Sequence, residues 1–370
     1  MTTAHAVSTG IPGMLCHVGT QGTGGDQGIF AARFDELTGQ LIPLGLAFEV
    51  ERPTWLTSDP AQPILYSVSE VGNAGDREGE VLSFTVDAVT GQLRLLGRTT
   101  SGGGGATHLA LDRESGALFV ANFGGGQVAA IPVDRAGGLS PLSSLQATAG
   151  SGPHRRQQGP HPHGVTLDPS RRFLLAPDMG ADRVFLFRYD STARTLSVAD
   201  PAFVALPSGS GPRLLVFGRD GRFAYLLTEL SAEVFTFAWD GGLGCLTQVG
   251  RIALDAPDAE GARSAAAIFL SLDGRFLYVS NRATGAIHVL AIDEATGGLT
   301  DIQQIASGGA MPWSIEIAPS GRWLIVANQA SDLLIVFAVD RASGRLTPTE
   351  ASLAVPKPTA IAFFGARMLG

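Results

Sequence analysis

Cysteine is scarce in this sequence: only Cys16 and Cys245 occur among its 370 residues. Two cysteines cannot form a disulfide framework, and their wide separation excludes a Cys-x-x-Cys zinc pattern. Charged residues are also few, at 16%, and the formal net charge is −8 with no run of basic residues to offset it. Because nucleic-acid backbones are bound by concentrated positive surfaces, this balance argues against a nucleic-acid partner.

Long apolar runs are missing as well. No stretch reaches 18 consecutive apolar residues, so the sequence predicts no membrane partner. The first residues lack the basic start and following apolar segment of a secretion signal. We therefore expect a soluble, cytoplasmic protein with a flexible N-terminus over residues 1–13.

Glycine, in contrast, is abundant, with 48 residues, and it accompanies 21 prolines and an apolar fraction of 45%. This composition is typical of a protein made of strands and turns. The sequence also repeats itself along its length, as repeat folds do. The four clearest copies are "DPSRRFLLAPDMGADRVFLFRYD" (168–190), "GRDGRFAYLLTELSAEVFTFAWD" (218–240), "SLDGRFLYVSNRATGAIHVLAID" (271–293) and "APSGRWLIVANQASDLLIVFAVD" (318–340). With the weaker copies included, the closing aspartates are spaced 47 to 56 residues apart, at Asp35, Asp87, Asp134, Asp190, Asp240, Asp293 and Asp340.

Each copy predicts four strands, the last of which follows a Thr-Gly type of turn whose glycine suits a positive φ. Four strands repeated about every 50 residues are typical of β-propeller blades. We therefore predict an all-β, seven-bladed propeller built from four-stranded antiparallel blades. The run at 357–367 resembles an innermost strand, and we expect it to complete the blade begun by residues 14–41. Strands from both termini would then close the ring, leaving no exposed edge and a single domain over residues 14–370.

Alignment of the copies predicts a pocket at the centre of this ring, where the leading ends of the innermost strands meet. One column of the alignment contains Thr54, Thr107, His163, Arg213, Ala266 and Trp313. The next column contains Trp55, His108, Gly164, Leu214, Ala267 and Ser314. A third polar column, at the end of the next strand outward, contains Thr20, Glu70, Asn122, Asp178, Glu229, Asn281 and Asn328. Because Asn and Asp commonly satisfy turn backbones, Glu70 and Glu229 are the better functional candidates in that column.

Several segments resemble the lactonase family of seven-bladed propellers, and the resemblance extends over nearly the whole chain. The most specific segments are "GSGPHRRQQGPHPHGVTLDPSRRFLLAPDMGADRVFLFRYD", "GSGPRLLVF", "TELSAEVFTF" and "YVSNRATGAIHVL". The family includes propeller-type 6-phosphogluconolactonases and muconate-lactonizing enzymes, so the resemblance implies an enzyme that makes or opens lactones. By position in these motifs, the family's proposed catalytic residues correspond to His163, Glu229, Arg213 and Arg282.

Four other positions depart from the family pattern. Leu214 and Phe269 replace histidines, Ala267 replaces a glutamate and Trp313 replaces an arginine. These changes make one side of the mouth more apolar and less basic. They favour a flatter or more apolar lactone or carboxylic acid over a phosphorylated sugar lactone.

His161 and His163 lie two residues apart, a spacing that in a strand would place both on one face. A zinc site would need further ligands, which His108 or Glu229 could supply, but two arginines at the same mouth oppose a cation. We therefore predict no metal and no cofactor. His163 is predicted to act as a general base or acid, whereas His161 is expected to orient the turn or the pocket wall.

The two arginines, Arg213 and Arg282, are predicted to clamp a carboxylate or an oxyanion. Glu229 either holds one of them in place or acts as the base itself. The residues predicted to bind substrate are His108, His161, Trp313, Trp55, Glu70, Phe269 and Leu214.

The function that these residues favour is metal-free hydrolysis of a small lactone, in the manner of a 6-phosphogluconolactonase but with a divergent substrate. One alternative is a cycloisomerase or lyase that interconverts an unsaturated, muconate-like acid and its lactone. A second alternative is a propeller that binds a ligand or a protein without catalysis, since a fold does not fix a function. The first two functions predict a small-molecule partner, a lactone or a carboxylic acid.

Overall fold

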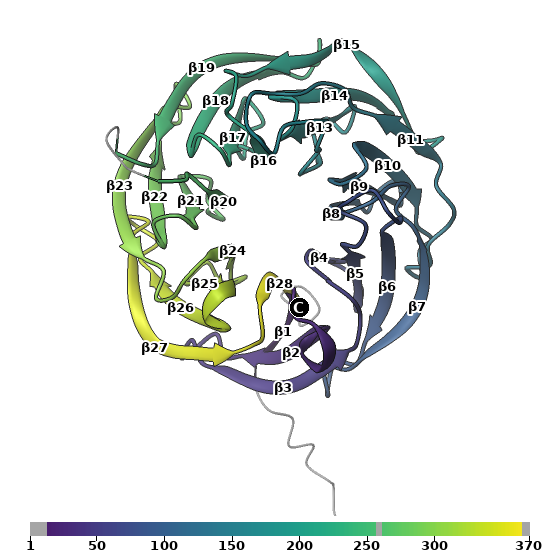
Figure 1. The fold of residues 1–370 in the computed structure, drawn as a ribbon. Helices are drawn as coiled ribbons and strands as arrows, with labels where there is room; N and C mark the ends of the chain where they lie inside the picture. Colours follow the sequence, from purple (N-terminus) through teal and green to yellow (C-terminus); the bar gives the residue numbers. More distant parts are fainter. Residues whose placement is uncertain (1–12, 257–260, 365–370) are drawn as a thin grey trace, which may run out of the picture.

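Seven four-stranded antiparallel sheets are arranged around a common centre in the computed structural model, which describes residues 13–256 and 261–364 (Figure 1). The predicted all-β, seven-bladed propeller is therefore confirmed. The flexible N-terminus expected over residues 1–13 lies, except for its last residue, outside the described residues, as do residues 365–370.

The strands of each sheet follow one another in the chain, except in the sheet that contains both ends of the chain. From the inner to the outer strand, the first four sheets are β28 (Pro358–Phe364), β1 (Met14–Thr20), β2 (Ile29–Phe34) and β3 (Leu41–Phe48); β4 (Leu56–Ser58), β5 (Ile64–Ser69), β6 (Glu80–Val86) and β7 (Leu93–Thr100); β8 (Ala106–Asp112), β9 (Ala117–Asn122), β10 (Gln127–Pro132) and β11 (Ser144–Ala147); and β12 (Thr166–Leu167), β13 (Phe173–Asp178), β14 (Arg183–Asp190) and β15 (Thr195–Ala205). The other three are β16 (Pro212–Phe217), β17 (Phe223–Thr228), β18 (Glu233–Asp240) and β19 (Cys245–Ala253); β20 (Ala265–Leu270), β21 (Phe276–Asn281), β22 (Ala286–Ile292) and β23 (Leu299–Ala306); and β24 (Pro312–Ile317), β25 (Trp323–Asn328), β26 (Leu333–Val339) and β27 (Leu346–Ala354). Two short 3-10 helices complete the described elements, η1 (Gly24–Asp26) and η2 (Gln329–Ser331). Each blade is named below by its inner strand.

The ring is closed by β28, which lies beside β1 (Figure 1). The two strands pair in antiparallel register, with His17 opposite Ala362. His17 is fully buried in this blade, where its ring meets the edge of Phe364 at a centroid distance of 5.3 Å. Its Nε2 donates a hydrogen bond of 2.8 Å to the Gly91 carbonyl of the neighbouring β4 blade. The predicted closure by strands from both termini is thus confirmed, and a buried polar contact accompanies it.

The core lies between the blades, because each sheet is covered on both faces by its neighbours. Strands β5, β9, β13 and β21 are buried at every residue, whereas the outermost strands alternate between exposed and covered residues. The hydrophobic clusters accordingly join adjacent blades, as where Phe187 of the β12 blade packs in one cluster with Phe119 of the β8 blade. This packing fixes the inner strand ends, which supply the residues of the site.

Candidate functional site

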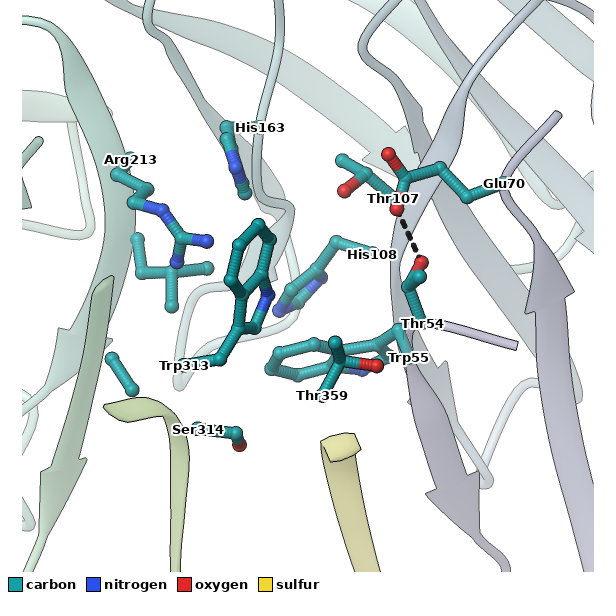
Figure 2. A pocket seen from close by; sticks show the side chains of 12 residues that line it. Thr54, Trp55, Glu70, Thr107, His108, His163, Arg213, Trp313, Ser314 and Thr359 are labelled. Carbon is teal, nitrogen blue, oxygen red and sulfur yellow. Dashed lines mark hydrogen bonds between the residues drawn. The ribbon is translucent and has the colours of Figure 1, made fainter. Parts of the chain in front are cut away.

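The leading ends of the inner strands surround a small cavity at the centre of the ring, and all seven blades contribute to it (Figure 2). Its lining residues are Thr54, Trp55, Glu70, Thr107, His108, His163, Arg213, Leu214, Ala267, Trp313, Ser314 and Thr359. The enclosed volume is about 20 Å³, which accommodates about one water molecule. Figure 2 shows Arg213 and His163 on one side, the hydrogen-bonded pair Thr54 and Glu70 on the other, and Trp313 and His108 between them.

The alignment of the repeats therefore located the cavity. Seven of the residues singled out from the sequence line it, namely Trp55, Glu70, His108, His163, Arg213, Leu214 and Trp313. The structure does not place the other four in the lining. They are His161, Glu229, Phe269 and Arg282.

Glu229 is buried behind the cavity wall, where three arginine side chains contact its carboxylate. They are Arg156, Arg213 and Arg282, at 2.5 Å, 2.9 Å and 2.9 Å. Burial alone would raise the pKa of this carboxyl, but the charges of Arg282, Arg213 and Arg156 outweigh burial and hold the pKa well below its usual range. Glu229 is therefore ionised at neutral pH, and both of its oxygens are occupied.

Arg213 links Glu229 to the cavity. Its Nε donates to Glu229 Oε2 and its Nη1 donates to the carbonyl of Ala266, so two sides of the guanidinium are fixed. Its Nη2 has no hydrogen-bond partner among the described residues. Burial and then the charge of Arg282 lower the pKa of Arg213 to about 10, so the side chain keeps its positive charge at neutral pH. Arg213 thus presents a charged donor at the edge of an enclosed space.

Arg282 lies behind Trp313 instead of facing the cavity. Its guanidinium carbon lies 4.5 Å from the centroid of the Trp313 ring, a cation–π arrangement, and its Nη2 pairs with Glu229 Oε1. Trp313 therefore covers one face of the Arg282 guanidinium. In this structure Arg282 contacts Glu229 and Trp313, and the direct substrate contact expected of it stays a prediction.

His163 lines the cavity beside Arg213, and its backbone N–H donates to the carbonyl of Pro177 at 2.9 Å. Its Nδ1 is buried without a hydrogen-bond partner among the described residues. Burial and then the charge of Arg213 hold the pKa of His163 well below its usual range, although Glu229 opposes the shift. His163 is therefore a neutral imidazole with a free ring nitrogen.

His108 is also neutral but is more firmly held. Its Nδ1 accepts a hydrogen bond of 3.4 Å from the backbone N–H of Val165, and its ring lies over Trp55 at a centroid distance of 4.0 Å. Burial and then the charge of Arg213 lower the pKa of His108 to about 3. His108 and Trp55 together form an aromatic wall of the cavity.

His161 does not line the cavity, and its side chain contacts Phe123. Its Nδ1 hydrogen-bonds the carbonyl of Phe123 at 2.7 Å and its ring stacks on the Phe123 ring at 4.6 Å. The side chain of His163 also touches Phe123, edge to face at 5.5 Å. His161 therefore supports the wall behind His163.

Phe269 departs from the expected position at the mouth. It packs against the hydrophobic cluster between the β20 and β24 blades. The reason is its place in the strand, because Phe269 lies two residues further along β20 than Ala267, which does line the cavity.

Glu70 lines the cavity, but its carboxylate already accepts hydrogen bonds from the hydroxyl of Thr54 at 2.5 Å and the amide of Asn73 at 2.8 Å.

The asparagines of the third aligned column are structural, as their residue type indicated. Asn122 donates to the carbonyl of Ser101 and Asn328 to that of Ser307, so each secures a turn between strands. Asn281 instead donates to the carboxylate of Asp255. None of them lines the cavity.

Arg156 is the functional candidate that sequence reasoning missed. It lies in the long segment between β11 and β12, which has no counterpart in the repeat, so aligning the blades gave it no position. Its Nη1 reaches Glu229 in the next blade. The sequence feature that could have indicated Arg156 is the pair of arginines shortly before the two histidines, in "HRRQQGPHPH".

The described residues, 13–256 and 261–364, contain no group of three His, Cys, Asp or Glu side chains that could hold a metal ion. Within the same ranges, no helix is long and apolar enough to cross a membrane.

Comparison with known proteins agrees with this architecture. A family model described as "Lactonase, 7-bladed beta-propeller" matches residues 15–363. The chain belongs to this lactonase family. It is similar to the solved structure of a periplasmic gluconolactonase from Pseudomonas aeruginosa, with 38% identity and a TM-score of 0.89 over 95% of this chain and 99% of that one. Among lactonase relatives with curated names, a 6-phosphogluconolactonase from Bacillus subtilis is 28% identical over 296 residues, which cover 80% of this chain and 82% of the relative.

A second 6-phosphogluconolactonase, from Formosa agariphila, is 27% identical over 297 residues, covering 79% of this chain and 82% of the relative. The resemblance to the lactonase family seen in the sequence is therefore confirmed, and the chain is a lactonase-type propeller. The cytoplasmic location stays a prediction, since one similar lactonase is described as periplasmic.

Proposed function

We propose that this lactonase-family propeller hydrolyses a small lactone without a metal, with His163 as the general base and Arg213 as the oxyanion donor. The observation that supports it is the pairing, at one cavity, of a neutral imidazole with a charged guanidinium whose Nη2 has no partner in the described residues. A base and an oxyanion donor are the two groups that attack of water on an ester carbonyl requires.

The reaction follows from the positions of these groups. A water molecule attacks the ring carbonyl carbon while His163 takes one of its protons. Negative charge develops on the carbonyl oxygen and is stabilised by Arg213. The bond between that carbon and the ring oxygen then breaks, and His163 returns the proton to the ring oxygen. The product is an open hydroxy acid.

Glu229 is the weaker candidate for the base. Three guanidinium groups occupy its two oxygens, and they hold its pKa well below the usual range after outweighing burial. Both carboxylate oxygens are already occupied, so neither is free to take a proton from water, whereas Nδ1 of His163 has no hydrogen-bond partner among the described residues. We assign Glu229 instead to positioning Arg213 and to stabilising the imidazolium that forms on His163. Arg282, which contacts Glu229 and Trp313, is assigned to the same positioning role.

Substrate contacts are proposed for the aromatic and polar residues that line the cavity, namely Trp55, Glu70, His108, Leu214 and Trp313. The cavity volume of about 20 Å³ is small for a lactone ring. We propose that side chains at the mouth move when the lactone binds. Trp313 lies between Arg213 and the aromatic wall (Figure 2). We therefore propose that the lactone lies against its ring.

A panel of lactones tests this function. The wild-type chain, His163→Ala and Arg213→Ala are compared by kcat/KM on the lactone that the wild type opens fastest. Loss of Arg213 is expected to reduce kcat/KM about 10²–10³-fold, the loss typical of one oxyanion donor. Loss of His163 is expected to reduce it about 10²–10⁴-fold. Both variants turning over the lactone at the wild-type rate would overturn the assignment.

The same assay separates the alternatives. Muconates incubated with the wild type would lose their diene absorbance if the chain were a lactonizing isomerase. Binding of lactones with no turnover of any of them would favour a non-catalytic propeller.

A further inference from the structure

Three arginine side chains contact the Glu229 carboxylate, although two of them already pair with its two oxygens. Arg213 and Arg282 are almost fully buried, with side chains 4% and 6% exposed, and both are committed to the wall behind the cavity. The side chain of Arg156 is 43% exposed. Two of the arginines are therefore part of the interior, whereas the third approaches the same carboxylate from solvent.

The bond between Arg156 and Glu229 can be given up without leaving a buried charge unpaired. Arg156 Nη1 contacts only Oε1 of Glu229, and Arg282 pairs with that same oxygen. Oε2 is held by Arg213. The carboxylate thus keeps a partner on each oxygen when Arg156 leaves, so departure avoids the large cost of an uncompensated buried ion.

The backbone that carries Arg156 is fixed even though its side chain is exposed. The adjacent Gln157 is completely buried, and its amide donates to the carbonyl of Met179 at 2.8 Å and to Asp182 Oδ1 at 2.7 Å. Its Oε1 accepts the backbone N–H of His154 at 3.1 Å. Rearrangement is therefore confined to the side chain of Arg156, whose backbone stays next to Glu229.

The charges around Glu229 do not balance. Three guanidinium groups face one carboxylate, and both cavity histidines, His108 and His163, are neutral. On the opposite side of the cavity, Glu70 is already paired with Arg52 at 3.5 Å. The region around Glu229 therefore has an excess of two positive charges in a protein whose formal net charge is −8. Such a local excess attracts an anion.

We propose that Arg156 is a substrate-binding, specificity-determining residue: it exchanges Glu229 for an anionic group, a carboxylate or a phosphate, carried by the lactone. Guanidinium groups bind both kinds of anion through charge-assisted hydrogen bonds. This inference rests on the proposed function and narrows the substrate class to lactones with an anionic substituent. It also amends the sequence-based expectation of a less basic site, because Arg156 adds a positive charge next to Glu229.

The test compares Arg156→Gln with Arg155→Gln, which removes the same charge from the adjacent exposed position. The probes are neutral glucono-δ-lactone, 6-phosphogluconolactone and a glucaric acid lactone, so that the phosphate and the carboxylate are tested separately. For Arg156→Gln, we expect the ratio of kcat/KM for a charged lactone to kcat/KM for the neutral one to fall about tenfold or more, mainly through KM. The charged lactone whose kcat/KM ratio falls, the phosphorylated or the carboxylated one, identifies the anion that Arg156 binds. Arg155→Gln should keep the wild-type ratio.

Equal ratios for both variants, or an unchanged ratio for Arg156→Gln with both charged lactones, would overturn this inference. Isothermal calorimetry with 6-phosphogluconate and glucarate supplies a readout independent of turnover. Binding that is lost in Arg156→Gln but kept in Arg155→Gln supports the inference even if no lactone is hydrolysed, which would defeat only the proposed function. Binding unaffected by Arg156→Gln defeats the inference even if hydrolysis is observed.

Discussion

At the scale of single residues, the site depends on how one buried carboxylate is shared. Glu229 fixes Arg213, and its charge also favours the protonated form of His163. The two roles that the sequence left open for Glu229, base or holder of an arginine, predict different consequences when its charge is removed. In the proposed mechanism the carboxylate acts through its neighbours.

We predict that Glu229→Gln reduces kcat/KM about 100-fold, because Arg213 loses the partner that orients it. The fall in kcat/KM on the acid side should persist and move to lower pH. The reason is that His163, whose pKa burial and Arg213 already hold below its usual range, also loses the charge that opposed this shift. A pH profile of both proteins measures this. Disappearance of the acid limb in the variant would instead identify Glu229 as the base.

The residues of the cavity were largely predictable because they occupy equivalent positions in repeated strands. His163, Arg213 and Trp313 come from three blades, and the repeat alone placed them in one column. Arg156 was not predictable in this way, since its approach to Glu229 depends on the path of a segment outside the repeat. The orientation of His161 depends on the carbonyl of Phe123, which no spacing rule specifies.

At the scale of elements, the segment between β11 and β12 determines the site on one side. Its last residues do not form the strand that the sequence suggested, because Pro160 and Pro162 have no N–H to donate to a ladder. Regular pairing is limited to the two residues of β12 and an isolated bridge between Pro162 and Asp178. His163 is nevertheless held by the Pro177 carbonyl.

This segment lies so close to the β13–β14 turn that Gly180 cannot carry a side chain. A Cβ there would lie 1.9 Å from the carbonyl oxygen of Gly159. We predict that Gly180→Ala displaces the segment, costs about 1–3 kcal/mol of unfolding free energy and lowers activity through His163. Gly159→Ala is the matched control, since a Cβ there meets nothing within 4 Å. Denaturant unfolding and kcat/KM of the two variants measure this, and equal stabilities would contradict it.

At the scale of the whole molecule, the ring is held closed by the pairing of β28 with β1, and His17 lies in this contact. Burial lowers the pKa of His17 to about 4, although the Gly91 carbonyl opposes the shift. A protonated Nδ1 would be a buried donor without an acceptor among the described residues. The neutral ring is therefore required for a stable closure.

Because the unfolded chain protonates histidine at about pH 6.5 and folded His17 only at about pH 4, the unfolded state binds more protons between these values. The contribution of neutral His17 to the free energy of unfolding is therefore fully present above about pH 6.5 and is lost as the pH falls toward 4. We predict that His17→Gln, which keeps a donor for Gly91, weakens this dependence. His108 and His163 contribute in the same direction, so part of it remains. The urea concentration at the unfolding midpoint is measured for the wild type and His17→Gln from pH 7.5 to 4.5. The same dependence of this midpoint on pH in both proteins would contradict the prediction.

The most direct test of the central claim, hydrolysis of a lactone with His163 as the base, is ring opening in H₂¹⁸O, corrected for the uncatalysed rate. We predict that the wild type introduces one ¹⁸O atom into the carboxylate of the product. We also predict that His163→Gln slows this labelled reaction about 10²–10⁴-fold. A product without label, or a His163→Gln variant that forms labelled product at the wild-type rate, would contradict the claim.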